Sequence, residues 1–395
     1  MQPLDLVEPW YYNTVYFILF LFLSWGTVLY YIGSDQQKIL HSEGSAMQGA
    51  ALFLTVALTF YLGLRPLSRS FGDMNMYRHT YENVLNSYAP ISYKTEWLWY
   101  NLSFFCKQLG FNPYEYFFIV EIGYFAGMYI CSLLLMRKNL WLAVLFFYIS
   151  FSCYSYGTNG IRNGLGCSIE LIAITLFALG GKKRPMSIVL MALAMGLHRS
   201  TILPSMAAIA SLYFVKDTKT AIRFWIASIA ISLVAGPLVE RFFAAFGFDD
   251  RMSDYASTNQ EDGAMNEFSQ TGFRWDFLFY SSGAVAMVWY VTRYRKFKDN
   301  VYTIIANSYL LCNAFWIMVI RSAFSNRFAY LSWFIYPVVM AYPLLRMNLW
   351  KDQDRKTALI FFLYSGFTLF MFFIYYFGTS NGFRGFDLYW YRREY

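Results

Sequence analysis

The sequence predicts an all-α, polytopic integral membrane protein with about 12 transmembrane helices. Of the 395 residues, 57% are hydrophobic and only 14% are charged, whereas a soluble chain carries about 25% charged residues. Aromatic residues make up 22% of the chain and many stand at the ends of apolar runs, as Trp and Tyr do at membrane interfaces. The apolar runs are about 15–23 residues long, close to the length that a membrane-crossing helix needs.

Twelve apolar windows mark the candidate helices of a single transmembrane domain that covers 1–395. In chain order the windows are 13–32, 48–64, 114–136, 139–156, 163–180, 186–198, 201–215, 221–239, 276–292, 301–320, 328–345 and 357–377. The windows 186–198 and 201–215 are short, so they form either one long broken helix or a re-entrant pair. The N-terminus "MQPLDLVEPW" has no basic residue, so the first window is expected to be a retained helix rather than a signal peptide.

Basic residues gather in alternate loops, which orients the chain. They are Lys38, Arg137, Lys138, Lys182, Lys183, Arg184, Lys216, Lys219, Arg223, the four within "RYRKFK" (293–298), Arg346, Lys351, Arg355 and Lys356. The positive-inside rule places these loops in the cytoplasm. Both termini are then outside, together with two longer loops, 65–113 and 240–275. The first of these contains "EWLWYNLSFFCKQL", in which the apolar residues favour one face of an amphipathic helix at the membrane interface.

The net charge and the cysteines exclude some function classes. The net charge is +8, but in a membrane chain an excess of Lys and Arg mainly reports topology, so no nucleic-acid partner is expected. The five cysteines lie mostly in apolar runs and show no zinc-binding spacing. No nucleotide-binding glycine motif is present either. The sequence therefore predicts no metal and no cofactor.

Arginines are frequent on the predicted outer side, against the positive-inside bias. They are Arg65, Arg69, Arg78, Arg162, Arg199, Arg274, Arg321 and Arg327. Any one of them could reach toward lipid headgroups. Lysine would serve that purpose equally well, yet outer lysines are few, Lys94 and Lys107. Because the guanidinium group binds phosphate through two parallel hydrogen bonds, the preference for arginine predicts a site for a phosphate or diphosphate.

Candidate bases lie near these arginines in the sequence. Asp73 and Tyr77 in "FGDMNMY" would share one face if that segment is helical, and Asp73 is either a helix N-cap or a carboxylate that takes a proton from a sugar hydroxyl. His198 ends an apolar run and is either a hydrogen-bonded side chain or a general base next to Arg199. Glu121 lies inside a predicted span, which makes it a candidate functional residue by default.

Five motifs in a fixed order resemble those of a known family. They are "RPLSRSFGDMNMY", "GIRNGLG", "GLHRSTILP", "GFRWDF" and "SNRFAYL", and they run from about 65 to 331 of this chain. The sequence resembles the EpsG-like polysaccharide polymerases, which are related to the Wzy-type O-antigen polymerases. The family pattern around the first motif often reads G-x-D followed by Tyr, whereas here Asp73 directly follows Gly72.

The resemblance implies a multi-spanning glycosyltransferase of the lipid-carrier type, similar in fold class to GT-C enzymes. Such an enzyme joins oligosaccharide repeats that are linked to undecaprenyl diphosphate, at the outer, periplasmic face of the bacterial inner membrane. The implied partners are this lipid-linked donor and acceptor, membrane lipids, a chain-length regulator and a flippase.

The predicted site follows from these inferences. His198 and Asp73 are the candidate catalytic bases. The predicted diphosphate and sugar ligands are Arg65, Arg69, Tyr77, Arg162, Arg199, Arg274, Arg321 and Arg327. The alternatives are a flippase for lipid-linked oligosaccharide, a lipid-to-acceptor glycan ligase, and a transferase that uses a polyprenyl-phosphate sugar. A transporter should show charged residues along a path through the membrane, whereas the predicted spans hold few acids besides Glu121 and Glu170.

Overall fold

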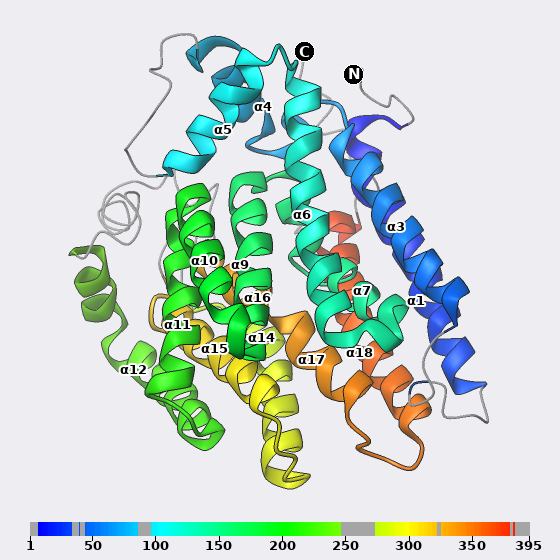
Figure 1. Cartoon of the computed structure of the whole chain (residues 1–395), viewed down its shortest axis with the longest axis vertical. Helices are drawn as coiled ribbons and strands as arrows, with labels where there is room; N and C mark the ends of the chain where they lie inside the picture. The colour runs from blue at the N-terminus through cyan, green and yellow to red at the C-terminus, as the bar shows by residue number, and fades with distance from the viewer. Residues whose placement is uncertain are drawn as a thin grey trace. The chain divides into compact units, whose positions relative to one another are not determined.

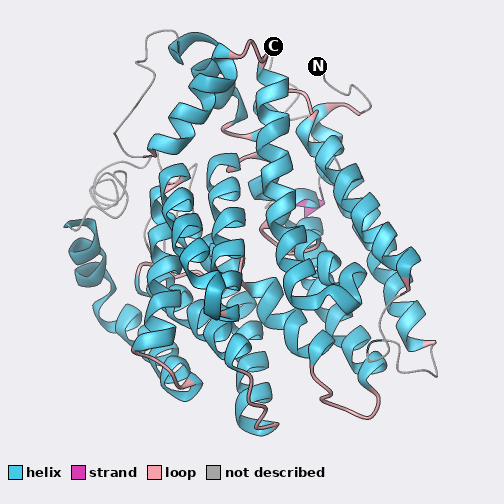
Figure 2. Cartoon of the chain, in the orientation of Figure 1, coloured by secondary structure: helices cyan, strands magenta, loops and turns pink. Residues whose placement is uncertain are grey.

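The computed structural model of the chain describes residues 7–33, 39, 44–85, 96–245, 273–321, 325–379 and 382–383. Nearly all of this part is helical, as Figure 2 shows. The strands β1 (Gly378–Thr379) and β2 (Gly382–Phe383) form one short antiparallel pair. The prediction of an all-α fold is therefore confirmed. The predicted outer loop 240–275 lies largely outside the described residues, as do most of the predicted outer termini.

The chain divides into two compact units. Unit 1 contains Met1–Ser168 and Leu344–Tyr395, and unit 2 contains Ile169–Pro343. Helix α9 (Ile161–Leu179) begins in unit 1 and ends in unit 2, and α17 (Tyr336–Arg346) ends just inside unit 1. The predicted single transmembrane domain stays a prediction.

Unit 1 is built from the first helices and the last one. Besides its part of α9 it contains α1 (Tyr12–Ile32), α3 (Ser45–Gly63), α4 (Met74–His79), α5 (Trp97–Gln108), α6 (Pro113–Met136), α7 (Leu140–Tyr148), α8 (Cys153–Thr158) and α18 (Gln353–Phe377). In Figure 1 these run from blue to cyan, with α18 in orange to red. Helix α6 begins with a capping box between Asn112 and Glu115 and has Pro113 in its first turn, both of which favour a helix start.

Aromatic contacts hold the long helices of unit 1 together. Helix α1 packs on α18, where the rings of Phe17 and Phe372 stack at 4.1 Å. Helix α3 packs on α6 and α7, and the hydroxyl groups of Thr55 and Tyr148 are 2.7 Å apart. Buried polar groups of this kind satisfy one another where water is absent.

Unit 2 contains the middle of the chain. Its helices are α10 (Arg184–Leu197), α11 (Ile202–Tyr213), α12 (Thr218–Ala245), α14 (Trp275–Trp289), α15 (Asn300–Met318) and α16 (Asn326–Trp333), with most of α17. Helix α12 departs from helical geometry at Ala235, two residues before Pro237, because proline disturbs the helical turn that precedes it.

Helix α15 lies at the centre of unit 2 and packs on α11, α12 and α16. The amide of Asn313 donates to the hydroxyl of Ser332 on α16 at 2.9 Å and accepts from the indole of Trp225 on α12 at 2.7 Å. The indole of Trp333 donates to Ser281 on α14 at 2.8 Å. These buried hydrogen bonds join four helices without charge, as in other helix bundles in membranes.

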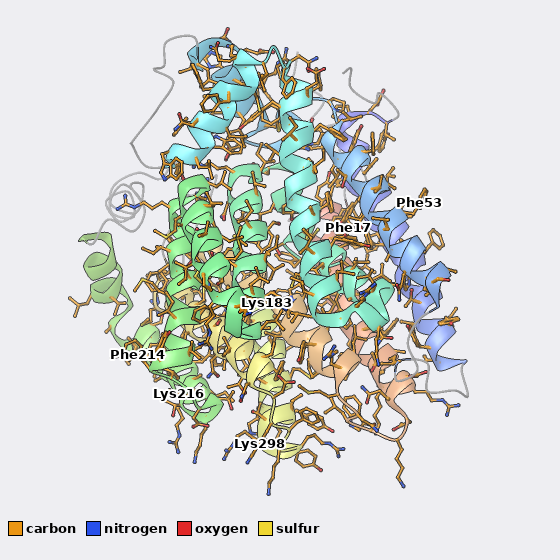
Figure 3. All side chains as sticks on the ribbon, in the orientation of Figure 1. Phe17, Phe53, Lys183, Phe214, Lys216 and Lys298 are labelled. Atoms are coloured by element: carbon orange, nitrogen blue, oxygen red, sulfur yellow. The ribbon has the colours of Figure 1, made fainter. Side chains whose placement is uncertain are left out.

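Membrane-spanning character is visible in helix length and in the side chains that face outward. Eight helical segments of the described residues are long and apolar enough to cross a membrane. They cover the predicted windows except 186–198, 201–215 and 276–292, so the count of about 12 spans stays a prediction. In Figure 3, Phe53 points away from the unit 1 helices and is 75% exposed, whereas Phe17 is buried between them. An exposed apolar surface of this extent is typical of lipid-facing helices. The chain is an all-α, polytopic membrane protein.

Lysines of two predicted cytoplasmic loops lie at one end of unit 2. Lys216 and Lys298 both project from the lower end of unit 2 in Figure 3, and the side chain of Asn307 on α15 donates to the main-chain carbonyl of Val215 at 2.7 Å, which holds the first of these loops against α15. Two of the predicted cytoplasmic loops therefore share one end of unit 2. Which side of the membrane this end faces stays a prediction.

Gly127 marks a close approach of α6 to α9. A Cβ atom at Gly127 would lie only 2.5 Å from the main-chain oxygen of Ser168. We expect Gly127→Val to destabilise the protein by about 1–3 kcal/mol, because the two backbones must move apart. Gly366→Ala in α18 is the matched control, since nothing lies within 4 Å of a Cβ there. Thermal unfolding of both variants in detergent would test this, and equal midpoints would contradict it.

Candidate functional site

Arg65 and Arg69 lie in the segment that follows α3, outside that helix. Helix α3 ends at Gly63, and Pro66 explains this end because a residue before proline is disfavoured in helical conformation. Arg69 begins a single 3-10 turn, Arg69–Phe71. Arg65 and Arg69 are therefore not one turn apart on a common helix. The side chain of Arg69 is exposed and has no hydrogen-bond or ion-pair partner among the described residues.

Arg65 is buried and joins three parts of unit 1. Its side chain is 1% exposed. Its Nη1 pairs with Glu121 Oε1 on α6 at 2.9 Å and also donates to the main-chain carbonyl of Leu62. Its Nη2 donates to the main-chain carbonyl of Thr158, at the end of α8, at 3.0 Å. This geometry favours a positioning role for Arg65, while its predicted direct contact with a substrate stays a prediction.

Gly72 brings Asp73 against α8. The φ angle of Gly72 is +65°, a region that favours glycine, and a Cβ there would lie 2.5 Å from Asn159 Oδ1. The same Asn159 oxygen accepts a 2.8 Å hydrogen bond from the main-chain N–H of Asp73. Asp73 stands at the N-cap of α4, but its carboxylate makes no capping hydrogen bond. The carboxylate of Asp73 is half-buried.

Aromatic rings connect α4 to α5. The ring of Tyr77 meets that of Trp99 edge-on at 5.7 Å, and Trp99 in turn contacts Tyr116 on α6. Tyr81 stacks on Tyr116 at 4.6 Å and donates its hydroxyl to the main-chain carbonyl of Phe111. Burial raises the pKa of the Tyr81 hydroxyl above its ordinary value, so Tyr81 stays protonated near neutral pH and is no candidate base.

Arg162 lies at the start of α9 and pairs with Glu96, the residue before α5. The distance from Arg162 Nη1 to Glu96 Oε2 is 2.5 Å, and the two side chains are 17% and 13% exposed. Glu96 has a left-handed backbone, with φ 64° and ψ 37°. The other two nitrogens of the Arg162 guanidinium make no hydrogen bond to the described residues.

The structure thus assembles one cluster in unit 1 from segments that are far apart in the sequence. We call the group Asp73, Tyr77, Glu96, Asn159 and Arg162 the Arg162 cluster. Figure 1 shows α4 and α5 at one end of α6. Sequence analysis named three of the five members as site residues. It did not name Asn159, although this residue stands in a predicted outer loop just before "GIRNGLG".

A second group of predicted residues lies in unit 2. Arg274 forms two hydrogen bonds with Asp276, at 3.0 and 2.6 Å, and its guanidinium lies 3.7 Å from the centre of the Phe277 ring. The guanidinium of Arg321 lies 5.8 Å from the Phe273 ring. Its Nε is buried without a hydrogen-bond partner among the described residues. Arg321 therefore contacts the residue that immediately precedes Arg274 in the chain.

The other predicted residues of unit 2 lie where helices begin or end. His198 is half-buried and has extended backbone between α10 and the 3-10 turn Arg199–Thr201. This turn packs on α16, which carries Arg327 in its first turn. Arg199 is exposed and Arg327 is half-buried. The four predicted arginines and the histidine of unit 2 thus stand at or near helix ends, as the sequence predicted.

Gly72 offers a test of how Asp73 is placed. We expect Gly72→Ala to lower activity strongly, because the new methyl group would displace Asn159 and with it Asp73. Gly110→Ala is the matched control: Gly110 has φ +82°, but nothing lies within 4 Å of its Cβ position. The activity of both variants would be measured at equal amounts of folded protein. Equal losses in both variants would show that backbone strain alone matters.

Comparison with known proteins gives one match. The model of the EpsG family matches residues 50–391 of this chain. No curated protein and no solved structure matches it, so the likeness to GT-C-type folds stays a prediction.

Proposed function

The chain belongs to the EpsG family, and from this premise we propose that it joins lipid-linked oligosaccharide repeats into a cell-surface polysaccharide. Family membership indicates a function of the exopolysaccharide polymerase type, carried out by a glycosyltransferase. The finer proposal is that donor and acceptor are both linked to undecaprenyl diphosphate. The reaction takes place at the outer face of the bacterial inner membrane, and both termini lie on that side.

The observation that supports this proposal most directly is the state of Arg162. Glu96 holds one of its nitrogens, and the others have no partner among the described residues. An arginine fixed on one side and open on the other can bind a phosphate oxygen with little loss of side-chain entropy. The exposed Arg69 lies in the same predicted outer loop as Glu96, and it is proposed as a second ligand.

Other residues around Arg162 suit a sugar. The half-buried ring of Tyr77 offers an apolar surface next to Trp99, and aromatic rings combine such a surface with a polar edge. The main-chain N–H of Asp73 donates to Asn159 at 2.8 Å, which fixes the backbone of Asp73, and its carboxylate is a candidate base for a sugar hydroxyl. In unit 2, His198 is the second candidate base, and Arg199, Arg274, Arg321 and Arg327 are further candidate ligands.

The proposed reaction is a glycosyl transfer. A hydroxyl oxygen of the acceptor repeat attacks the anomeric carbon of the donor sugar and forms the new glycosidic bond. The bond from that carbon to the diphosphate oxygen breaks, and undecaprenyl diphosphate leaves with the electron pair. The base accepts the hydroxyl proton. The arginines stabilise the negative charge that develops on the leaving diphosphate.

A flippase for the same lipid is the alternative function. A transport path should present charged groups inside the membrane that a passing headgroup could contact. Glu121 and Glu170, two acids in the middle of described spans, each use one carboxylate oxygen within the protein, since Glu121 pairs with Arg65 and Glu170 accepts a 2.9 Å hydrogen bond from Ser205. This favours the polymerase over the flippase. A lipid-to-acceptor ligase would need similar arginines. It differs from the polymerase in the molecule that accepts the glycan.

A reconstituted assay tests the proposal. Purified protein in liposomes would receive one defined repeat linked to undecaprenyl diphosphate, and the products would be separated by size. We expect a ladder of repeat lengths and one released undecaprenyl diphosphate for each bond formed. Movement of the lipid-linked repeat between leaflets without a ladder would favour the flippase instead. A chain-length regulator and a flippase are the proposed protein partners, and adding the regulator should shift the ladder.

A further inference from the structure

We propose that Glu96 is a positioning residue, whose carboxylate fixes the guanidinium of Arg162 so that its free nitrogens face the diphosphate of the substrate. This inference rests on the proposed function and assigns a role to a residue for which the sequence predicted none.

The contact itself is the first argument. At 2.5 Å, with side chains only 17% and 13% exposed, the ion pair is partly shielded from water, which strengthens the attraction between its two charges. A second ion pair in the same predicted outer loop, Arg78 with Glu82, differs in its exposure to water. That pair spans one helical turn and is 43% and 37% exposed, and such surface pairs contribute little.

The backbone of Glu96 is the second argument. Its φ of 64° is one of two positive values among the described residues that are not glycine. A residue with a Cβ atom adopts this conformation at an energetic cost, and such residues gather at functional sites. Glycine or asparagine would adopt it more easily. The presence of glutamate therefore indicates that its side chain contributes something that offsets the cost.

The place of Glu96 in the fold is the third argument. It immediately precedes α5, and two residues into α5 the ring of Trp99 contacts Tyr77. The Glu96–Arg162 pair thus links the start of α5 to the start of α9, and it sets Arg162 at a defined place relative to Tyr77. A loose Arg162 would have to lose side-chain entropy when the substrate binds, which lowers affinity.

The test compares four variants in the polymer assay. We expect Glu96→Gln to lower kcat/KM for the lipid-linked repeat about 10–100-fold, the factor expected when a close and partly buried charge pair is lost. Glu96→Gly and Glu96→Asn should lose as much, although both residues relax the backbone. Glu82→Gln is the matched control and should retain wild-type kcat/KM.

A double-mutant cycle separates positioning from a structural role. In an Arg162→Lys background, Glu96→Gln should cause little further loss, because the two residues act as one unit. Equal losses in both backgrounds, or full activity of Glu96→Gly, would overturn the inference.

Binding of undecaprenyl diphosphate distinguishes failure of this inference from failure of the proposed function. The purified protein in detergent would be titrated with this lipid by calorimetry. We expect Glu96→Gln to bind at least about tenfold more weakly than wild type, even before any polymer is made. Wild-type binding without polymer formation would overturn the polymerase alone, whereas equal binding by wild type and Glu96→Gln would overturn the role of Glu96.

Discussion

Arg162→Lys is expected to abolish polymer growth while the protein still inserts and folds. Lysine keeps the positive charge, but it lacks the planar group that can hold Glu96 with one nitrogen and a phosphate oxygen with another. Losing one charge-assisted interaction in the transition state should lower kcat/KM about 10–100-fold. Because the polymer grows by many successive additions, long products should disappear altogether.

The measurement is the ladder of products from the reconstituted protein, with the initial rate of undecaprenyl diphosphate release as the second readout. Arg293→Lys is the control, since Arg293 is exposed in the π-helical turn that follows α14 and lies in a predicted cytoplasmic loop. Wild-type product lengths from Arg162→Lys would remove Arg162 from the proposed diphosphate site. The same experiment with Arg69→Lys examines the second proposed ligand.

Glu121→Leu is expected to have the largest effect on stability. The side chains of Glu121 and Arg65 are 2% and 1% exposed, so the replacement leaves a buried guanidinium without its counter-ion. Breaking a buried ion pair in this way costs about 3–5 kcal/mol. The loss should appear as a lower midpoint of thermal unfolding in detergent and as less folded protein in the membrane.

The double variant Arg65→Met/Glu121→Leu separates charge from packing. Replacing both partners with apolar residues of similar size removes the uncompensated charge, and such replacements are often close to neutral. We therefore expect the double variant to recover most of the stability that Glu121→Leu loses. If both proteins unfold at the same temperature, the ion pair is not what stabilises this part of unit 1. Polymer formation by the recovered double variant would show in addition that Arg65 makes no essential contact with the substrate.

The sequence predicted most of the architecture because the membrane constrains it strongly. Apolar length identified α1, α3, α9, α12, α15 and α18 close to their observed bounds, since an isolated backbone in lipid must satisfy its hydrogen bonds within a helix. The segment at α5 was predicted from its amphipathic pattern, and a helix is observed there. The apolar pattern did not show how the chain runs between Arg65 and Arg69, where Pro66 follows the end of α3 and Arg69 begins a separate turn.

Composition and the order of the motifs by themselves determined the class of this protein and its family, because these properties belong to the chain and not to its packing. Only the tertiary structure decided what the individual arginines do. Arg65, Arg69 and Arg162 look alike in the sequence, yet one is buried against Glu121, one is exposed, and one is held by Glu96 with nitrogens to spare. Partners such as Glu96 and Asn159 come from distant segments, and only the packing of α5, α8 and α9 determines which charges meet.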